Sequence, residues 1–406
     1  MQSELPFNPA PSTVVHIDIN SCFATIEQQA RPYLRGKPLA VAAYDTPNGV
    51  ILAPSIEAKR YGIKTGMRVR EGRERFPGLI VRTPDALMYR YVHHRFREIL
   101  GEYTPEVFPK SIDEFVLYVR GTVDIRATAR EIKERIRRDV GEWIWTSAGI
   151  GPTRFTAKVA AGMKKPDGLT EINHKNFLAQ YGRLELLDLH GINLHLQRRL
   201  WRAGITTPLA MYRASLQTLK VAFNSVVAHY WYSRLRGWEV DDVEFARRSY
   251  GNSYSLPRPL GAPEELTPVL AKLVNKMAFR MRKAGYQAAG VYLSLSYKNG
   301  AYFNRQRTLP EALFDTRDIY KAAVKILKMS PYNAPVKKLA VGCFNLRKAS
   351  GLQLELFEPT GKKFRAMEAF DRANDRWGDF VITTGTMLET EDYVPDRIAF
   401  GSPLVA

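Results

Sequence analysis

Two adjacent acidic residues, Asp113 and Glu114, restrict what this chain can fold into more than any other feature, because they lie between two hydrophobic runs. The run "EVFP" precedes the pair and "FVLYV" follows it. Neighbouring side chains on a strand point to opposite faces, so one carboxylate should point into the core, where an unpaired charge is costly. The segment therefore predicts a β-hairpin with the pair at or next to its turn, where both carboxylates can face one side.

A third carboxylate, Asp18, lies near the end of another hydrophobic strand, "TVVHIDI" at residues 13–19. Carboxylates gathered in this way repel one another unless a cation lies between them, and Mg²⁺ prefers oxygen ligands. Two such ions can hold the attacking and leaving oxygens of a phosphoryl transfer. The alternative is that Asp113 and Glu114 only cap a turn or pair with Lys110, and spacing alone does not decide between the two.

The wider pattern predicts an α+β protein of several domains, which a length of 406 residues allows. We expect a β-hairpin at 37–55 and only helices at 175–240. Further helices and one strand are expected between these segments, the helices at 55–69, 86–103, about 122–140 and 154–165 and the strand at 146–152. His93 and His94 are interpreted as solvated helix residues rather than metal ligands.

The last third of the chain reads as a separate unit. Residues 247–258, "RRSYGNSYSLPR", are interpreted as a basic linker punctuated by Gly and Pro. After it, the periodicity predicts a small β-α-β unit, with helices at about 264–285 and 316–328 and strands at 290–297, 301–309 and 337–348.

Charge is concentrated in this unit. The net charge of the whole chain is +19, and residues 247–348 contain 19 Lys and Arg against 5 Asp and Glu. Such a balance favours a polyanionic partner, nucleic acid above all, over a basic surface kept for solubility. No apolar run approaches eighteen residues and no leader opens the sequence, so we expect neither membrane insertion nor secretion. Two cysteines, Cys22 and Cys343, are too few for a disulfide framework, which favours a reducing, cytoplasmic location.

Four segments resemble, in their order, the Y-family translesion DNA polymerases: "HIDINSCFATIEQ", "SIEAKRYGIKTGM", "SIDEFVLYV" and "GIGPTRFTAKVAAGMKKPDG". The resemblance covers about residues 13–350 and is closest to the bacterial DinB (polymerase IV) and UmuC branches. It implies a right-hand polymerase of α+β class with a palm, small fingers, a helical thumb and a β-α-β little finger. The implied parts are an N-terminal arm at 1–12, palm at 13–21 and 88–174, fingers at 22–87, thumb at 175–240, linker at 241–252, little finger at 253–348 and tail at 349–406.

The resemblance also implies the active site. Asp18, Asp113 and Glu114 would be the catalytic metal ligands, together with the carbonyl of Ile19, and would hold two Mg²⁺ ions, with Mn²⁺ able to substitute. Phe23 would be the steric gate that excludes a 2′-hydroxyl, with Cys22 beside it; the alternative is an ordinary core Phe.

Lys59 and Lys165 would contact the triphosphate of the incoming dNTP. Two residues depart from the DinB pattern, since Lys59 replaces the usual Arg and Ile56 replaces a phosphate-contacting Tyr. A lysine offers a point charge without the bidentate fork of Arg. The UmuC branch is similar to this chain here, which leaves open which branch the chain follows.

DNA contacts are implied in two places. Residues 187–206 resemble a helix-hairpin-helix, with Gly191 and Asn193 in its hairpin, although an ordinary helix turn fits as well; Asn tolerates positive φ better than most residues. In and near the little finger, the basic residues expected to contact primer-template DNA are Arg247, Arg248, Lys298, Arg305, Arg307, Lys337, Lys338 and Arg347. Tyr297, Tyr302 and Phe303 are interpreted as packing residues rather than base-stacking ones.

"QLELF" at 353–357 is similar to peptides that dock in the bacterial sliding clamp, with Gln353, Leu354, Leu356 and Phe357 as the contacting residues. The alternative is a terminal strand packed on its own domain. The expected function is template-directed, error-prone translesion synthesis of low processivity by a monomer. The rivals are a catalytically silent DNA and clamp scaffold, disfavoured by the three carboxylates, and a two-metal nuclease, disfavoured by Phe23 and Lys165.

Overall fold

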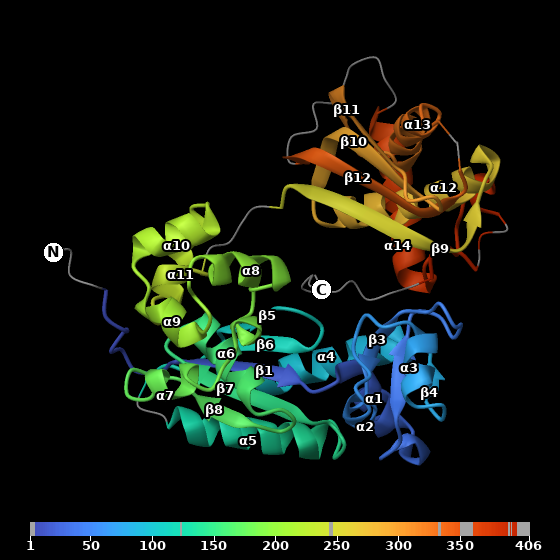
Figure 1. Ribbon diagram of the computed structural model, residues 1–406. Helices are drawn as coiled ribbons and strands as arrows, with labels where there is room; N and C mark the ends of the chain where they lie inside the picture. Colours follow the sequence, from blue (N-terminus) through green and yellow to red (C-terminus); the bar gives the residue numbers. More distant parts are fainter. Residues whose placement is uncertain are drawn as a thin grey trace. The chain divides into compact units, whose positions relative to one another are not determined.

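The computed structural model describes residues 5–121, 124–242, 247–331, 334–349, 360–388, 390 and 392–395. The chain divides into two compact units (Figure 1), one formed by the described residues up to 242 and the other by those from 247 to 395.

A five-stranded sheet forms the centre of the first unit, in the order β5-β6-β1-β7-β8. Its strands are β1 (Val14–Ile19), β5 (Val107–Pro109), β6 (Glu114–Tyr118), β7 (Thr146–Gly151) and β8 (Leu169–Glu171). All pairs are antiparallel except β7 with β8. The expected hairpin around Asp113 and Glu114 is therefore confirmed. Every residue of β1 is buried, as its β-branched sequence and central position require.

Helices cover both faces of this sheet. Val15 and Ile17 of β1 pack with α4 (Ala86–Gly101) and α5 (Ile125–Asp139) in one core. On the opposite face Val14 packs against Ala157 of α6 (Arg154–Met163). Figure 1 shows α5 and α6 on opposite sides of the strands. Because side chains alternate along β1, its even-numbered residues, which include His16 and Asp18, face the side of α6.

A smaller three-stranded sheet, in the order β3-β2-β4, follows α1 (Cys22–Ala30) and η1 (Pro32–Leu34). Its strands are β2 (Leu39–Ala42), β3 (Ile51–Pro54) and β4 (Ile80–Arg82), accompanied by α2 (Ile56–Arg60) and α3 (Val69–Arg75). The expected β2–β3 hairpin is confirmed, and it packs a small core of its own around Ala40, Ile51 and Leu79.

The regular elements of residues 175–240 are all helices, as predicted, and they form a separate core that includes Met211 and Trp231. Side-chain caps start several of these helices: Asn193, Thr207 and Ser215 each accept a hydrogen bond from a backbone N–H three residues on. The elements are α7 (Phe177–Tyr181), η2 (Leu186–Asp188), α8 (Leu194–Arg202), α9 (Pro208–Arg213), α10 (Leu216–Phe223) and α11 (Val227–Arg234).

The second unit is a four-stranded antiparallel sheet in the order β11-β10-β12-β9, with helices packed against one face. Its elements are β9 (Ser249–Leu260), α12 (Pro263–Lys283), β10 (Tyr286–Tyr297), β11 (Tyr302–Leu313), α13 (Thr316–Leu327) and β12 (Val336–Lys348). The interpretation of residues 247–258 as a linker is wrong, because β9 pairs with β12 and buries Tyr250, Tyr254 and Leu256. Its two prolines are tolerated because β9 is an edge strand.

The residues after the sheet complete this unit. In α14 (Thr360–Trp377), Asp371 makes a two-pronged ion pair with Arg282 of α12, at 2.6 and 2.7 Å. A turn of 3-10 helix, η3 (Gly385–Met387), follows. Lys272, only 6% exposed, donates a 2.6 Å hydrogen bond to the carbonyl of Thr390. Among the described residues of both units, no helix has the length and apolar character needed to cross a membrane.

Candidate active site

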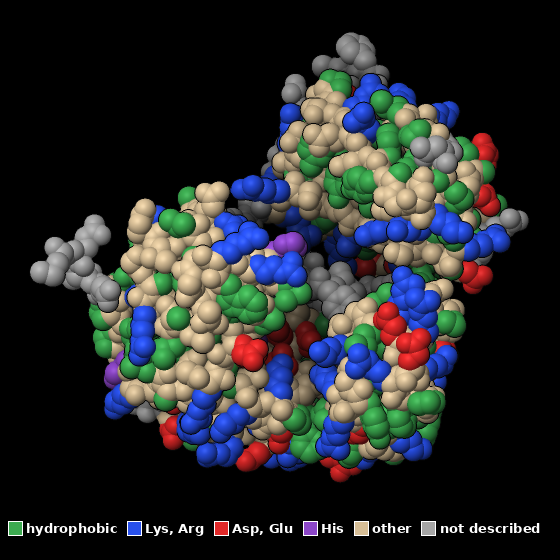
Figure 2. All heavy atoms as spheres, in the orientation of Figure 1, with side chains coloured by type: hydrophobic (Ala, Val, Ile, Leu, Met, Phe, Trp, Pro, Cys, Tyr) green, Lys and Arg blue, Asp and Glu red, His purple; other side chains and the backbone are tan. Residues whose placement is uncertain are grey.

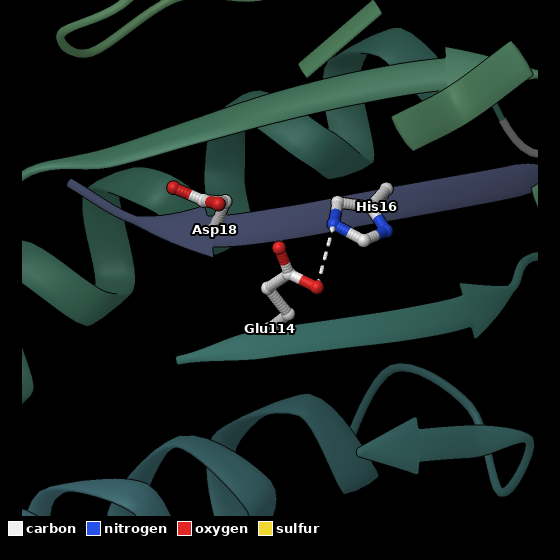
Figure 3. A group of neighbouring side chains, drawn as sticks. All are labelled: His16, Asp18 and Glu114. Carbon is white, nitrogen blue, oxygen red and sulfur yellow. Dashed lines mark ion pairs between the residues drawn. The ribbon is translucent and has the colours of Figure 1, made fainter. Parts of the chain in front are cut away.

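The register of two strands brings Asp18 and Glu114 together. Asp18 on β1 lies directly opposite Glu114 on β6, and the backbone N–H of Ile19 donates to the carbonyl of Asp113 at 2.9 Å. Residues opposite one another in an antiparallel pair share a face, so both carboxylates lie on the side of α6. Figure 3 shows Asp18 and Glu114 converging with a third side chain, His16, from the same strand as Asp18.

Asp113 occupies the hairpin turn just before β6. Its carboxylate accepts a 2.5 Å hydrogen bond from the hydroxyl of Ser111 and is half-buried. The ligand atoms of His16, Asp18 and Glu114 all lie within 4.8 Å of one another, and Asp113 is not part of this group. The structure thus brings two of the three predicted carboxylates into one cluster and leaves the third at its edge.

Two lysines associated with α6 hold the clustered carboxylates. Lys158 Nζ lies 2.6 Å from Glu114 Oε2, and Lys165 Nζ lies 2.6 Å from Asp18 Oδ1. Lys165 was predicted from the sequence to contact phosphate, whereas Lys158 was missed. The only sequence signal for Lys158 is its place in a helix that follows β7, which does not reveal the strand that it reaches.

The environment gives the three carboxyls different acid strengths. Burial raises the pKa of Asp18, against the opposing effect of the Lys165 ammonium. Burial also raises the pKa of Asp113, against the hydrogen bond from Ser111. Burial would raise the pKa of Glu114 as well, but the electrostatic interactions of Glu114 with the His16 ring and with the Lys158 ammonium, which also donates a hydrogen bond to it, outweigh this effect, and the net pKa is lowered.

His16 is the residue of the cluster that sequence reasoning missed. Its side chain is 2% exposed, and neither ring nitrogen finds a hydrogen-bond partner among the described residues. Its Nε2 lies 4.0 Å from Glu114 Oε2. Burial lowers the pKa of His16 to about 3, so the imidazole is neutral at pH 7. The signal was present in "HID", because residues two apart on a strand share a face.

This set of groups fits a divalent cation. Carboxylate oxygens are suitable ligands for such an ion. Two lysine ammoniums already pair with them, so the site accommodates positive charge. A buried imidazole, His16, also faces them and has no hydrogen-bond partner among the described residues. The cluster is therefore a candidate metal centre built on the central strand of the first unit.

The predicted nucleotide-pocket residues lie beside it. Ser21 adopts a left-handed turn, with φ of 53°, between β1 and α1. Cys22 follows and is buried; burial and the negative charges of Asp113 and Asp18 raise its pKa. Phe23 is 4% exposed and stacks on Tyr89, with ring centroids 4.5 Å apart.

Lys59 is exposed on α2, next to half-buried Ile56 at the start of that helix. Neighbouring protein groups partly desolvate its ammonium, and this loss of hydration, with the like charge of Lys165, lowers the pKa of Lys59, while Asp18 opposes the shift. Lys59, Lys165 and Asp18 thus share one electrostatic environment, in which two cations adjoin the acidic cluster.

The structure corrects one histidine assignment. His93, expected to be solvated, is 2% exposed, and its ring stacks on Phe115 at 4.7 Å. Its Nδ1 lies 3.0 Å from the carbonyl of Ile112. The prediction failed because this face of α4 packs on the β5–β6 hairpin, whereas His94 on the neighbouring face is exposed.

The predicted helix-hairpin-helix has Gly191 at φ of 100°, but Asn193 does not use the left-handed region. Asn193 has φ of −105° and caps α8 by accepting from the N–H of Leu196 at 3.0 Å. Asn193 therefore acts as a helix cap, and the tolerance of Asn for positive φ plays no part at this position. Both residues are exposed.

The predicted basic residues of the second unit are all exposed, and Lys and Arg side chains are prominent on its face in Figure 2. Arg305 and Arg307 lie opposite Leu293 and Val291, on the helix-bearing side of the sheet, while Lys338 lies opposite Ser296 on the open side. The other predicted contacts, exposed as well, are Arg247, Arg248, Lys298, Lys337 and Arg347.

Two of the three aromatic residues interpreted as packing residues do pack: Tyr297 is buried and Phe303 contacts the core. Tyr302 is 63% exposed, so that interpretation is wrong for it; its hydroxyl accepts from Ser294 on the open side of the sheet. The "QLELF" segment, with Gln353, Leu354, Leu356 and Phe357, lies outside the described residues.

Comparison with known proteins gives consistent matches. A family model described as the impB/mucB/samB family matches residues 17–162, and the model of the C-terminal domain of that family matches residues 247–356. A protein named DNA polymerase IV from Moorella thermoacetica is 35% identical over 387 residues, which cover 93% of this chain and 96% of that protein. A DNA polymerase IV from Pelotomaculum thermopropionicum is 33% identical over 389 residues, covering 94% and 96%.

Among solved structures, a Y-family DNA polymerase chimera of Dbh and Dpo4 is similar with a TM-score of 0.72 and 22% identity, over 82% of this chain and 98% of that one. An insertion ternary complex of Dbh DNA polymerase gives a TM-score of 0.59 and 22% identity over the same shares. This likeness in fold confirms the predicted α+β, multidomain architecture.

Proposed function

The chain belongs to the Y-family of DNA polymerases, and on that premise we propose that it extends a primer on a template strand, damaged templates included. The observation that carries the proposal is the pairing of Asp18 with Glu114 on the central strands, with Asp113 at the adjoining turn. A catalytically silent scaffold has no need of three carboxylates gathered beside cations, so that alternative is not favoured.

In the proposed reaction the primer 3′ oxygen attacks the α-phosphorus of a dNTP, a new P–O bond forms, and pyrophosphate leaves. Asp18, Asp113, Glu114 and the carbonyl of Ile19 would hold two Mg²⁺ ions, with Mn²⁺ able to substitute, and these would activate the primer hydroxyl and neutralise the triphosphate. Lys158 and Lys165 compensate the charge of Glu114 and Asp18 in the resting protein. If Asp18 bound a metal ion instead of Lys165, the Lys165 ammonium would become available to the triphosphate.

The groups beside the cluster would select the nucleotide. Lys59 and Lys165 supply two positive charges for the phosphates. Phe23, held against Tyr89, presents a ring that would clash with a ribose 2′-hydroxyl, and Cys22 packs next to it. We therefore propose that this ring is the steric gate for deoxyribonucleotides.

We propose that the five-stranded sheet is the palm, the three-stranded sheet the fingers, residues 175–240 the thumb, and the second unit the little finger. In the thumb, Gly191 and Asn193 would contact the DNA backbone. In the second unit, the exposed basic residues predicted from the sequence would contact phosphates without reading bases. The chain would act as a monomer in the cytoplasm, with "QLELF" docking in a sliding clamp.

Primer extension tests the proposal. Asp18→Asn, Asp113→Asn and Glu114→Gln should each reduce extension by at least about a hundredfold, because each removes a charge that stabilises the transition state. Glu142→Gln, on an exposed residue paired with Arg35, is the matched control and should extend normally.

Binding of the variants to primer-template DNA, measured by fluorescence anisotropy, should stay close to that of the unaltered protein. Normal extension by the three variants contradicts the assigned site. DNA binding without extension by the unaltered protein supports the scaffold, and Mg²⁺-dependent primer degradation supports the nuclease.

A further inference from the structure

The loop at residues 164–168, which joins α6 to β8, is held by two cations of α5. Lys133 Nζ donates to the carbonyls of Asp167 and Gly168, at 2.6 and 3.2 Å, and lies 3.1 Å from Asp167 Oδ1. Arg137 donates to Asp167 Oδ2 at 2.8 Å. Because α5 covers the face of the sheet opposite to α6 (Figure 1), these cations reach the loop from the side away from the acidic cluster.

Asp167 adopts a backbone conformation that its surroundings must hold in place. Its φ of 60° is in the left-handed region, which few residues other than Gly, Asn and Asp adopt. Its N–H donates to Asn20 Oδ1 at 2.8 Å, and Asn20, one residue beyond β1, is only 3% exposed. The side chain and the N–H of Asp167 are thus fixed by two different elements, α5 and the turn after β1.

The rest of the loop is closed as tightly. A Cβ at Gly168 would lie 1.8 Å from the carbonyl oxygen of Lys164, so this position accepts glycine alone. The N–H of Gly168 donates to Ser147 Oγ at 3.2 Å, and Ser147, buried on β7, donates in turn to Asn20 Oδ1 at 3.0 Å. The Cα of Lys165 therefore lies in a loop that is fixed on both sides of it.

Such a loop suits a lysine that must bind a phosphate. The ammonium of Lys165 is a point charge on a flexible stem, so its position depends on that of its Cα. A misplacement of about 1 Å in a positioning group can cost much of its effect. Lys165 Nζ lies 2.6 Å from Asp18 Oδ1, and its side chain is 41% exposed and accessible to a ligand. The alternative is that Lys133 only fastens α5 to the sheet, in which case nucleotide affinity does not depend on it.

We propose that Lys133 and Asp167 are positioning residues: their ion pair, supported by Arg137, places Lys165 where its ammonium meets the phosphates of the incoming nucleotide. The inference rests on the proposed function for the contact between Lys165 and the triphosphate. It goes beyond that function by assigning part of the nucleotide affinity to a helix on the other face of the sheet. Since Lys133 and Asp167 act through Lys165, they should affect the KM for dNTP far more than kcat or the affinity for DNA.

Single-nucleotide insertion by the full chain measures this effect. Lys133→Met should raise the KM for the correct dNTP by about tenfold or more, with kcat and the Kd for primer-template DNA changed by less than about threefold. Lys133→Arg keeps the charge and should return the KM to within about threefold of that of the unaltered protein. Arg138→Met is the matched control and should leave the KM unchanged, because Arg138 lies on the same helix but pairs with Asp139, at 2.8 Å.

A double-mutant cycle separates positioning from a general loss of stability. Lys165→Met should raise the KM, and adding Lys133→Met should raise it no further, because Lys133 acts through Lys165. A KM raised by the product of the two single effects would overturn the proposal, as would an unchanged KM in Lys133→Met. If Lys133→Met fails to fold, Asp167→Asn takes its place in the cycle with the same expected outcomes, since Asn also tolerates a positive φ.

Hydrogen exchange in the unaltered protein needs no variant. The N–H groups of Asp167 and Gly168 should be protected before any nucleotide is added, because Asn20 and Ser147 accept their hydrogen bonds in the free protein. Protection that arises only when a dNTP is added would show that the nucleotide itself orders the loop. That result would also overturn the proposal.

The outcomes distinguish this inference from the proposed function. If Lys165→Met raises the KM and Lys133→Met does not, the inference fails and the polymerase assignment stands. If Lys165→Met leaves the KM unchanged while Asp18→Asn abolishes extension, the phosphate contact is wrong and the inference fails with it, but the assignment again stands. Normal extension by Asp18→Asn contradicts the proposed function itself and removes the premise of the inference.

Discussion

Replacing Lys158 by Met should lower the stability of the metal-free protein and raise its affinity for divalent cations. Lys158 Nζ lies 2.6 Å from Glu114 Oε2, and the two side chains are only 26% and 19% exposed. At an effective dielectric constant near 20, unit charges at that distance attract by about 6 kcal/mol, most of which is offset by desolvation and lost side-chain freedom. We expect the free energy of unfolding to fall by about 1–3 kcal/mol, the usual worth of a charge-assisted hydrogen bond.

The free energy of the Lys158–Glu114 ion pair should also be measurable as a difference in metal affinity between the variant and the unaltered protein. A cation that binds Glu114 must displace Lys158, so the unaltered protein loses the ion pair on binding and the variant has none to lose. Coupling of about 1–3 kcal/mol corresponds to an affinity that is about 5–150-fold higher in the variant. Titration calorimetry with Mg²⁺ and Mn²⁺ measures this, alongside chemical unfolding in EDTA. Lys175→Met, on an exposed lysine outside the cluster, is the control.

The pH dependence gives an independent check. The folded-state pKa of Glu114 is lowered, with Lys158 among the causes, so the ion pair stabilises the fold above the ordinary glutamate pKa and is lost as pH falls through the folded value. The stability difference between Lys158→Met and the unaltered protein should therefore be full at pH 7 and shrink below about pH 4. A difference that is independent of pH, or an unchanged or lower Mg²⁺ affinity in the variant, would refute the competition between Lys158 and the cation.

Three further predictions concern other parts of the chain. Phe23→Ala should raise kcat/KM for matched ribonucleotides relative to deoxyribonucleotides, and an unchanged ratio in a folded variant would mean that another residue excludes ribose. Arg282→Met should lower the free energy of unfolding by about 2–4 kcal/mol, because it leaves Asp371 without its two-pronged partner; equal stability in chemical unfolding would show that α14 is not anchored there. Replacing Leu356 and Phe357 together by Ala should abolish stimulation by a sliding clamp and leave clamp-free extension unchanged, whereas a variant inactive without a clamp would place the segment in the fold.

Local pattern was enough to predict the strands that carry the cluster. The β-branched run around Asp18 and the hydrophobic runs around Asp113 both form strands of the central sheet. Their pairing, and hence the meeting of Asp18 with Glu114, came from the family resemblance, because no local pattern determines which strands become neighbours. Lys158 was missed for the same reason, since its contact with Glu114 joins separate elements, whereas the position of His16 two residues before Asp18 on one strand could be read from the sequence.

The errors arose where tertiary packing outweighs composition. Strand β9 contains Gly and Pro residues typical of a linker, yet its alternating tyrosines and leucines bury one face against α12. His93 lies among Arg and Tyr residues that suggest a solvated helix, but the hairpin carrying Ile112 covers that face. In both cases the deciding neighbour lies far along the chain or belongs to another element.

The last described residues of the second unit affect the order in which parts of the chain can fold during synthesis. Lys272 is buried against the carbonyl of Thr390, 118 residues further along the chain, and Val394 belongs to the core of this unit. During synthesis on a ribosome, residues 5–242, which form the described part of the first unit, emerge before these residues are translated. The second unit can complete its core only after they have left the exit tunnel. A messenger that ends early would therefore yield a chain that contains the residues of the acidic cluster but lacks part of the core of the second unit.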